Sequence, residues 1–286
     1  MSDEEAEVVG GGTEENTAAG EGTPSEAASR ISEYMGGFLG ASYAPDAISE
    51  AAGKEAFHDR FNHRMVSLGL RRQHNIEAIV SAAYEATETD AADLNDGEID
   101  SDWMARFMSY AEQVGNTDMQ PVWGYVLARE FAAPGSIGLP VLTCLANMTP
   151  SDIDLWERIG RITYGEGYVF KVGGRNQFER FNVARADIMQ LQDLGLLQDA
   201  QDLSITFGAE TKGLTFDFRG TQIILRHPEN VLFTLPAYKL SSAGLKLFEL
   251  LITAPVDENY LRAFGSELKP KGYDYRLRLA DGSLVE

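Results

Sequence analysis

The sequence has one cysteine among its 286 residues, Cys144, and this cysteine lies in an apolar stretch. A single cysteine excludes an internal disulfide framework and a zinc site built from several cysteines of one chain. Lone cysteines in apolar stretches usually pack as small core residues. We therefore expect Cys144 to lie in the core rather than to act as a nucleophile, and the lack of disulfides fits a reducing cytoplasm.

Long hydrophobic runs are also missing. No stretch approaches the ~20 apolar residues that a membrane-spanning helix needs. The nearest approach, residues 31–44, is shorter and rich in glycine. The first residues, MSDEEAEVV, are acidic where a secretory signal peptide would be basic. These observations predict a cytoplasmic protein without a membrane partner.

Positive charge is scarce. The chain has 24 lysines and arginines against 44 acids, which gives a formal net charge of −20. A surface of this sign repels nucleic-acid phosphates and anionic lipids at long range, and it favours solubility. We therefore expect a protein partner or self-association rather than a nucleic acid.

One stretch, residues 54–74, has the opposite charge. It contains five bases and two acids, a local net charge of +3. The simpler interpretation is that these bases pair with the protein's own acids in a helical bundle. The functional interpretation is a docking patch for an acidic partner or a nucleic acid. The candidate patch consists of Arg60, Arg64, Arg71 and Arg72.

No catalytic or metal-binding pattern is recognisable. Of the four histidines, His58 and His63 are five residues apart, so they point to different sides of a helix and lack the spacing of a zinc protease motif. The glycine-rich segments lack the features of a phosphate-binding loop or a dinucleotide fingerprint, and no G-x-S-x-G elbow occurs. We therefore predict no catalytic residue, no cofactor and no metal, and we expect a protein that is not an enzyme.

Composition divides the chain into three parts. Residues 1–24 hold seven acids and no base, and they have too few large apolar side chains to offset the entropy of ordering, so we predict a disordered acidic tail. Residues 25–165 have helical periodicity and predict a helical bundle. Residues 166–286 contain short β-rich runs between helices, which predicts a smaller α/β unit. The expected fold class is mainly α, and α+β overall.

Local signals place the helix boundaries. Helical spacing runs from 46 to 68, where Gly69 is expected to interrupt or kink the helix before the next one at 71–87. We expect later helices to begin at Asp100 or Ser101, at a capping box of Thr117 with Gln120, at Ser136 and at Thr149. In the last part, helices are expected to open at Asn182 or Val183, at Ser241 or Ser242, and at Asp257. Aromatic residues at helical spacing are expected to pack in the bundle core: Trp103, Phe107, Trp123, Phe131 and Trp156.

The last part resembles a winged-helix domain. The segment LQDLGLLQ (191–198) is similar to a helix that ends in a Leu-Gly-Leu turn, β-strands follow it, and YKLSSAGLKLF (238–248) is similar to the closing helix. The helix before Gly195 lacks the basic face that phosphate contacts require. We therefore expect a winged-helix-like unit used for protein contact. The alternative is a DNA-binding transcriptional regulator that uses this unit.

Most of the chain resembles the bacterial domain-of-unknown-function family 2806. The similarity rests on RRQHNIEAIV (71–80), on DSDWMARF (100–107) and the helices after it, and on LQDLGLLQ and LSSAGLKL. Within a motif of this family the matching residues are Met119, Gln120, Trp123, Leu127, Ala128, Pro134, Gly135 and Ser136, whereas Pro121 and Ile137 depart from it. The resemblance covers about 71–265 and implies no activity. A weaker similarity to the abortive-infection alpha family implies a phage-defence context. Together, these observations predict an interaction or regulatory protein.

Overall fold

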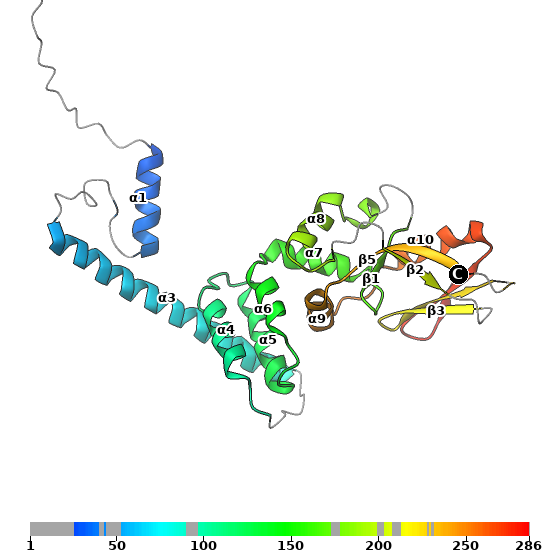
Figure 1. The fold of residues 1–286 in the computed structure, drawn as a ribbon, viewed down its shortest axis with the longest axis horizontal. Coiled ribbons are helices and arrows are strands. Elements are labelled where there is room, and N and C mark those ends of the chain that lie inside the picture. The colour runs from blue at the N-terminus through cyan, green and yellow to red at the C-terminus, as the bar shows by residue number, and fades with distance from the viewer. Residues whose placement is uncertain are drawn as a thin grey trace, which may run out of the picture. The chain divides into compact units, whose positions relative to one another are not determined.

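The computed structural model describes residues 26–39, 43, 53–89, 97–172, 178–198, 203–207, 213–227, 229 and 232–285. It divides into two compact units, Met1–Leu70 and Arg71–Glu286. The described residues form nine α-helices and two small antiparallel sheets (Figure 1). The predicted α+β class with more helix than strand is therefore confirmed. The predicted tail at 1–24 lies outside the described residues, and the boundary near residue 165 stays a prediction.

The first unit contains two described helical segments. Helix α1 spans Glu26–Leu39, and helix α3 spans Gly53–Thr89, so the part of α3 up to Leu70 belongs to this unit. Both segments are amphipathic in sequence, but none of their described residues is buried. These helices have apolar faces that no described part of the unit covers.

Helix α3 runs without a break through Gly69, so the predicted interruption at this residue is wrong. The predicted residues 46–52 lie outside the described part of the chain. Gly69 has no neighbouring atom within 4 Å of the place that a Cβ would occupy, and its φ is not positive. A glycine inside a helix costs only about 1 kcal/mol relative to alanine. A cost of this size does not end a helix of this length.

Replacing Gly69 by alanine should therefore stabilise α3 locally by about 0.5–1 kcal/mol. Amide hydrogen exchange over residues 65–73 should slow by roughly two- to fivefold, because 1.4 kcal/mol corresponds to a factor of ten. Faster exchange in the G69A variant would contradict the continuous helix through this residue.

In the second unit, four helices follow the remainder of α3. They are α4 (Ser101–Ala111), α5 (Gln120–Ala132), α6 (Leu139–Ala146) and α7 (Pro150–Gly160). Two predicted starts are confirmed. The Asp100 carboxylate accepts a hydrogen bond from the Trp103 backbone N–H at 2.8 Å, and the Asp152 carboxylate accepts one from the Thr149 backbone N–H at 2.7 Å.

The predicted caps at Thr117 and Ser136 are wrong. Asn116 accepts instead from the backbone N–H groups of Asp118 and Met119, and α5 begins after this turn. Before α6, the fully buried carboxylate of Glu130 accepts from the backbone N–H groups of Gly135 at 2.6 Å and Ile137 at 2.9 Å. An acid from the preceding helix therefore organises the turn where a local hydroxyl was expected.

Helices α3 and α5 approach closely at Gly124. A Cβ at this position would lie 2.6 Å from the Ala82 Cβ, so only glycine permits the contact. Of the predicted core aromatics, Trp103, Phe107, Trp123 and Trp156 are buried. Phe131 is 44% exposed, which contradicts its predicted place in the core. Tyr84 of α3 is 70% exposed.

The first sheet contains β1 (Tyr168–Phe170), β2 (Ser204–Phe207) and β5 (Phe233–Lys239) in the antiparallel order β1-β5-β2. Between β1 and β2 lie the short 3₁₀ helix η2 (Glu179–Phe181) and α8 (Arg185–Asp193). The predicted helix start at Asn182 or Val183 is wrong, because Asn182 adopts a left-handed conformation with φ of 56° that ends η2. Helix α9 spans Ser242–Leu251, and its predicted Ser241 cap is confirmed.

The second sheet has the order β3-β4-β6-β7. Strands β3 (Gly213–Phe218) and β4 (Thr221–Arg226) form a hairpin whose two turn residues both have positive φ, as a type I′ turn requires. Helix α10 (Glu258–Leu268), capped as predicted by Asp257, and η3 (Lys269–Lys271) lead into β6 (Asp274–Arg278) and β7 (Leu284–Val285).

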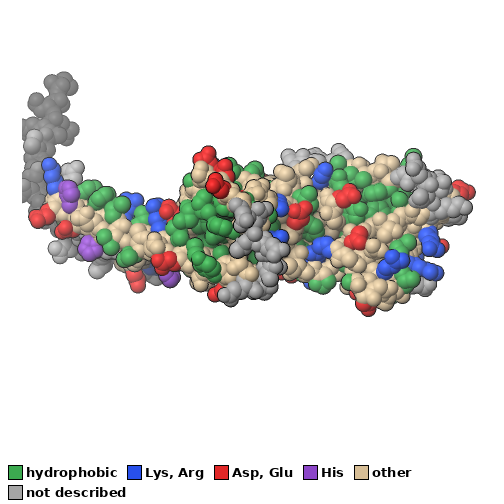
Figure 2. Space-filling view, turned by 90° about the horizontal axis from the view of Figure 1, so that it is seen from below, with side chains coloured by type: hydrophobic (Ala, Val, Ile, Leu, Met, Phe, Trp, Pro, Cys, Tyr) green, Lys and Arg blue, Asp and Glu red, His purple; other side chains and the backbone are tan. Residues whose placement is uncertain are grey.

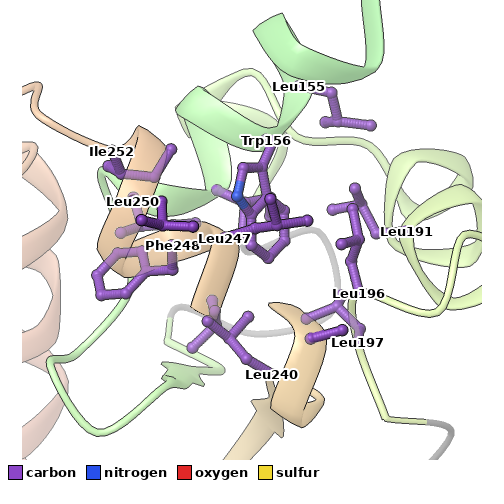
Figure 3. Packing of buried hydrophobic residues seen from close by; sticks show 14 of the residues in the cluster. Leu155, Trp156, Leu191, Leu196, Leu197, Leu240, Leu247, Phe248, Leu250 and Ile252 are labelled. Atoms are coloured by element: carbon purple, nitrogen blue, oxygen red, sulfur yellow. The ribbon is translucent and has the colours of Figure 1, made fainter. Parts of the chain in front are cut away.

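A continuous apolar core joins the helices and sheets of the second unit. Figure 3 shows Trp156 of α7 surrounded by leucines from α9 and from the segment that follows α8. Helix α9 approaches this segment closely at Gly244, where a Cβ would lie 2.1 Å from the Leu196 carbonyl oxygen. The Leu-Gly-Leu turn and the closing helix are therefore packed directly against each other.

Candidate functional site

The described residues contain no group of three or more histidine, cysteine or acidic side chains that could hold a metal ion. His58 Nδ1 lies 2.8 Å from the Lys54 carbonyl oxygen, and His227 Nδ1 lies 2.8 Å from that of Glu229. Cys144 is buried as predicted, and burial raises the pKa of its thiol. The reactive thiolate form of this side chain is therefore disfavoured.

The predicted basic patch is divided between the two units. Arg72 belongs to the second unit and forms an ion pair with Glu112 at 3.3 Å, and Arg71 is half-buried beside it in sequence. Arg60 and Arg64 belong to the first unit and form no ion pair with any described residue. The simpler interpretation, pairing with the protein's own acids, therefore holds for Arg72. Docking through the patch stays a prediction.

Exposed apolar side chains form stripes on both helices of the first unit. On α3, Phe57, Phe61 and Met65 follow one another at intervals of four residues and are 60%, 47% and 49% exposed. Residues at this interval lie on one face of a helix. On α1, the corresponding exposed residues are Ile31, Tyr34 and Phe38. Val66 and Leu70 add further exposed apolar surface to α3. Contiguous apolar patches on a protein surface commonly mark sites of interaction with another molecule.

The charge of these two segments differs from that of the whole chain. Residues 26–39 and 53–70 contain four acids (Glu26, Glu33, Glu55, Asp59) and four bases (Arg30, Lys54, Arg60, Arg64). Their net charge is therefore zero in a chain of −20. These two segments therefore lack the negative charge that predominates in the rest of the chain.

A second apolar surface lies within the second unit, between the end of α3 and helices α4 and α5. It is a hollow of about 340 Å³. Figure 2 shows hydrophobic side chains gathered over α4 and α5 on this face. The residues that line it are Val80, Ala83, Tyr84, Thr87, Met104, Met108, Leu127, Ala128 and Phe131. The hollow explains why Tyr84 and Phe131 are exposed, since both stand at its edge.

A third surface, a basic hollow of about 450 Å³, was not predicted. It lies on the second sheet and is lined by Ile224, Arg226, Lys269, Asp274, Tyr275, Arg276, Arg278 and Leu284. Lys and Arg side chains gather at this end of the molecule in Figure 2. The run 269–278, KPKGYDYRLR, has four bases and one acid. This excess is the signal in the sequence that could have identified the surface.

Helix α8, which a DNA-binding winged-helix unit would use for recognition, is not basic. Arg185 is exposed, but the Asp187 carboxylate lies in the first turn, where it accepts from the Ala184 backbone N–H. Gln190 donates to the Asp152 carboxylate of α7, and Met189 is exposed. This distribution agrees with the predicted absence of a basic face.

The comparisons with known proteins decide the family. The model of a family described as "Protein of unknown function (DUF2806)" matches residues 59–264, which is more than half of the chain. The chain belongs to the DUF2806 family. The predicted resemblance to this family is thereby confirmed, and the match runs from within α3 to within α10.

Membership of the DUF2806 family assigns no activity. No curated protein matches the chain, and no solved structure does. The weaker similarity to the abortive-infection alpha family stays a prediction, as does the phage-defence context that it implies. Among the described helices, none combines the length and the apolar character needed to cross a membrane.

Proposed function

We propose that this protein is a non-enzymatic interaction protein that self-associates through the two helical segments of its first unit. The observation that carries the proposal is the absence of any buried side chain among the described residues of α1 and of α3 up to Leu70. Eight large apolar side chains of these segments are exposed. Isolated helices are marginally stable in water, and most of their stability in proteins comes from packing an apolar face.

A second copy of the same chain is the partner that fits best. Each chain supplies two amphipathic helices, and two such pairs can bury all four apolar faces in one four-helix bundle. The zero net charge of the two described segments makes local repulsion weaker there than between surfaces that carry the average charge of a −20 chain. The apolar hollow at the end of α3 supplies a separate surface for another protein, since methionines and aromatics are enriched at such sites.

Replacing both Phe57 and Phe61 by aspartate tests the proposal. Burying one phenylalanine contributes about 1.5–3 kcal/mol, and every 1.4 kcal/mol changes a dissociation constant tenfold. The double variant should therefore dissociate at least a hundredfold more readily, which a dilution series in sedimentation velocity would measure.

The matched control replaces Met189 and Leu232 by aspartate, because both are exposed apolar residues of the second unit. This variant has the same change of charge and should associate as the unaltered chain does. Equal weakening in both variants would assign the effect to charge alone and contradict the proposal.

The second candidate function is a DNA-binding regulator that uses a winged-helix-like unit. The strand order β1-β5-β2, with α8 between β1 and β2, supports this candidate, because winged-helix domains pair the strand before the recognition helix with the last strand of the wing. The charge distribution on α8 opposes it. Duplex binding that falls with salt and is lost on changing Arg185 would favour this candidate over self-association alone.

A further inference from the structure

The basic hollow on the second sheet has a regular arrangement of cations. Arg276 and Arg278 are two residues apart on β6, so both side chains lie on the same face of the sheet. Their partners on β4 are Ile224 and Gln222, while Arg226 pairs with Asp274. Lys269 lies at the rim of the same hollow. Four cations and the carboxylate of Asp274 therefore line one hollow, and Asp217 of β3 lies on the same face of the sheet, opposite Gln222.

These cations are not neutralised by the described part of the protein. Arg226, Lys269, Arg276 and Arg278 form no ion pair with a described residue, although the chain has 44 acids. Arg278 forms a hydrogen bond with a neutral side chain instead: its Nη1 donates to Gln222 Oε1 at 3.2 Å. The Gln222 amide in turn donates to the Asp217 carboxylate at 2.9 Å. The Lys269 ammonium group lies 5.1 Å from the centre of the Tyr275 ring.

The spacing of the cations indicates the kind of anion. Two residues along a strand span about 6.6 Å, and neighbouring strands lie about 4.8 Å apart. Arg226, Arg276 and Arg278 are therefore spread along β4 and β6 and do not surround one point, and Lys269 adds a fourth cation from η3. An arrangement of this kind matches successive phosphates of a polymer better than a single phosphate. Arginine guanidinium groups bind phosphate oxygens in pairs, which favours phosphate recognition.

We propose that this basic face binds the phosphodiester backbone of a nucleic acid. The hollow offers Ile224 and Leu284 as its apolar residues, and Tyr275 lies under Lys269, so bases gain no free aromatic platform for stacking. Recognition is therefore independent of base sequence. The site is separate from the self-association surface of the first unit and does not depend on it.

The net charge of −20 does not prevent this contact. At physiological ionic strength the Debye length is about 8 Å, so acids further away than this are largely screened from the bound phosphates. The overall charge predicts slow and weak association, whereas the local cations determine where binding occurs.

The test measures fluorescence anisotropy of the full-length chain with a labelled 16-nucleotide oligothymidylate and, separately, with a 16-base-pair duplex. Four phosphate contacts predict a slope of log affinity against log salt of roughly −3 for the single strand and roughly −3.6 for the duplex. Binding of either form with such a slope supports the proposal. The form that binds more tightly shows whether the face prefers single-stranded or duplex nucleic acid. No binding of either form at 50 mM salt overturns it.

The decisive variant replaces Arg276 and Arg278 by glutamate and should weaken binding at least thirtyfold. The control replaces Arg106 and Arg185 by glutamate, an equal change of charge on exposed residues of α4 and α8, and should weaken binding less than threefold. The lysine variant R276K/R278K should retain most of the affinity. Thermal unfolding of each variant shows whether it is folded. If the R106E/R185E control loses binding while R276E/R278E keeps it, the site lies outside the basic face and the proposal is wrong.

A polyglutamate peptide of equal length serves as competitor. The proposal predicts that it displaces the oligonucleotide poorly. Equal displacement would identify an acidic protein segment as the ligand class and would overturn the assignment to a nucleic acid.

Discussion

Replacing Gly244 by alanine is expected to lower the free energy of unfolding of the second unit by at least about 3 kcal/mol. The added Cβ would lie 2.1 Å from the Leu196 carbonyl oxygen and 3.2 Å from the Leu196 Cα. Backbone atoms cannot move aside as the end of a flexible side chain can. The same carbonyl accepts the Ser241 backbone N–H at 2.9 Å, so the conflict also breaks the hydrogen bond at the start of α9.

Thermal unfolding measures this effect. For a unit of about 200 residues, 1 kcal/mol corresponds to roughly 2–4 °C, so the transition should fall by at least about 6 °C. Gly115→Ala is the matched control, because the nearest atoms to its added Cβ, those of the Asn75 amide, are 3.9 Å away. We expect G115A to change the transition by less than about 2 °C. Similar shifts in both variants would show that the close approach at Gly244 is absent.

Replacing Glu130 by alanine is expected to cost about 3 kcal/mol as well. The carboxylate is fully buried and accepts two backbone hydrogen bonds, from Gly135 and Ile137. Hydrogen bonds to a charged group contribute roughly 1.5–3 kcal/mol each, and the N–H groups left without an acceptor would be partly or fully buried. The Ile137 carbonyl in turn accepts the Trp103 indole N–H at 2.7 Å, so the disturbance should reach the tryptophan.

Urea unfolding followed by tryptophan fluorescence measures both consequences of E130A. The free energy of unfolding of the E130Q variant should lie between those of the unaltered chain and E130A. The glutamine amide keeps one acceptor oxygen for the two backbone N–H donors. Glu157→Ala, at an exposed position of α7, should leave stability within about 0.5 kcal/mol. An E130A variant as stable as E157A would contradict the role of this carboxylate in the turn.

The predictions that the structure confirms depend on short-range chemistry. Asp100, Thr149, Ser241 and Asp257 lie next to the helices that they begin, and each side chain forms a hydrogen bond with an atom no more than three residues away. Thr117 and Ser136 have the same residue types, yet Asn116 and Glu130 perform the capping there. Glu130 reaches seven residues along the chain, and no pattern of adjacent residues indicates this.

The exposure of a side chain is harder to predict from the sequence than its place on a helix face. Helical spacing correctly identifies an apolar face around Ile79 and Ala83, which are buried, but it does not determine whether another element covers Tyr84 or Phe131. The stripe on α3 from Phe57 to Met65 has the same spacing and is exposed. Periodicity therefore identifies surfaces that require a partner without saying whether the partner belongs to the same chain.

The basic face was missed because the run 269–278 supplies only part of it, and pairing with a distant segment supplies the rest. Arg226 and Arg276 are fifty residues apart in the chain, and the antiparallel pairing of β4 with β6 brings them to one surface. The net charge of −20 averages over the whole chain and conceals this local excess.

The molar mass of the full-length chain in solution tests the central claim most directly. Light scattering coupled to size-exclusion chromatography should give at least twice the 31.4 kDa of one chain at micromolar concentration. The variant F57D/F61D should shift toward 31.4 kDa under the same conditions. An unaltered chain that remains at 31.4 kDa across the concentration range would contradict self-association through α1 and α3.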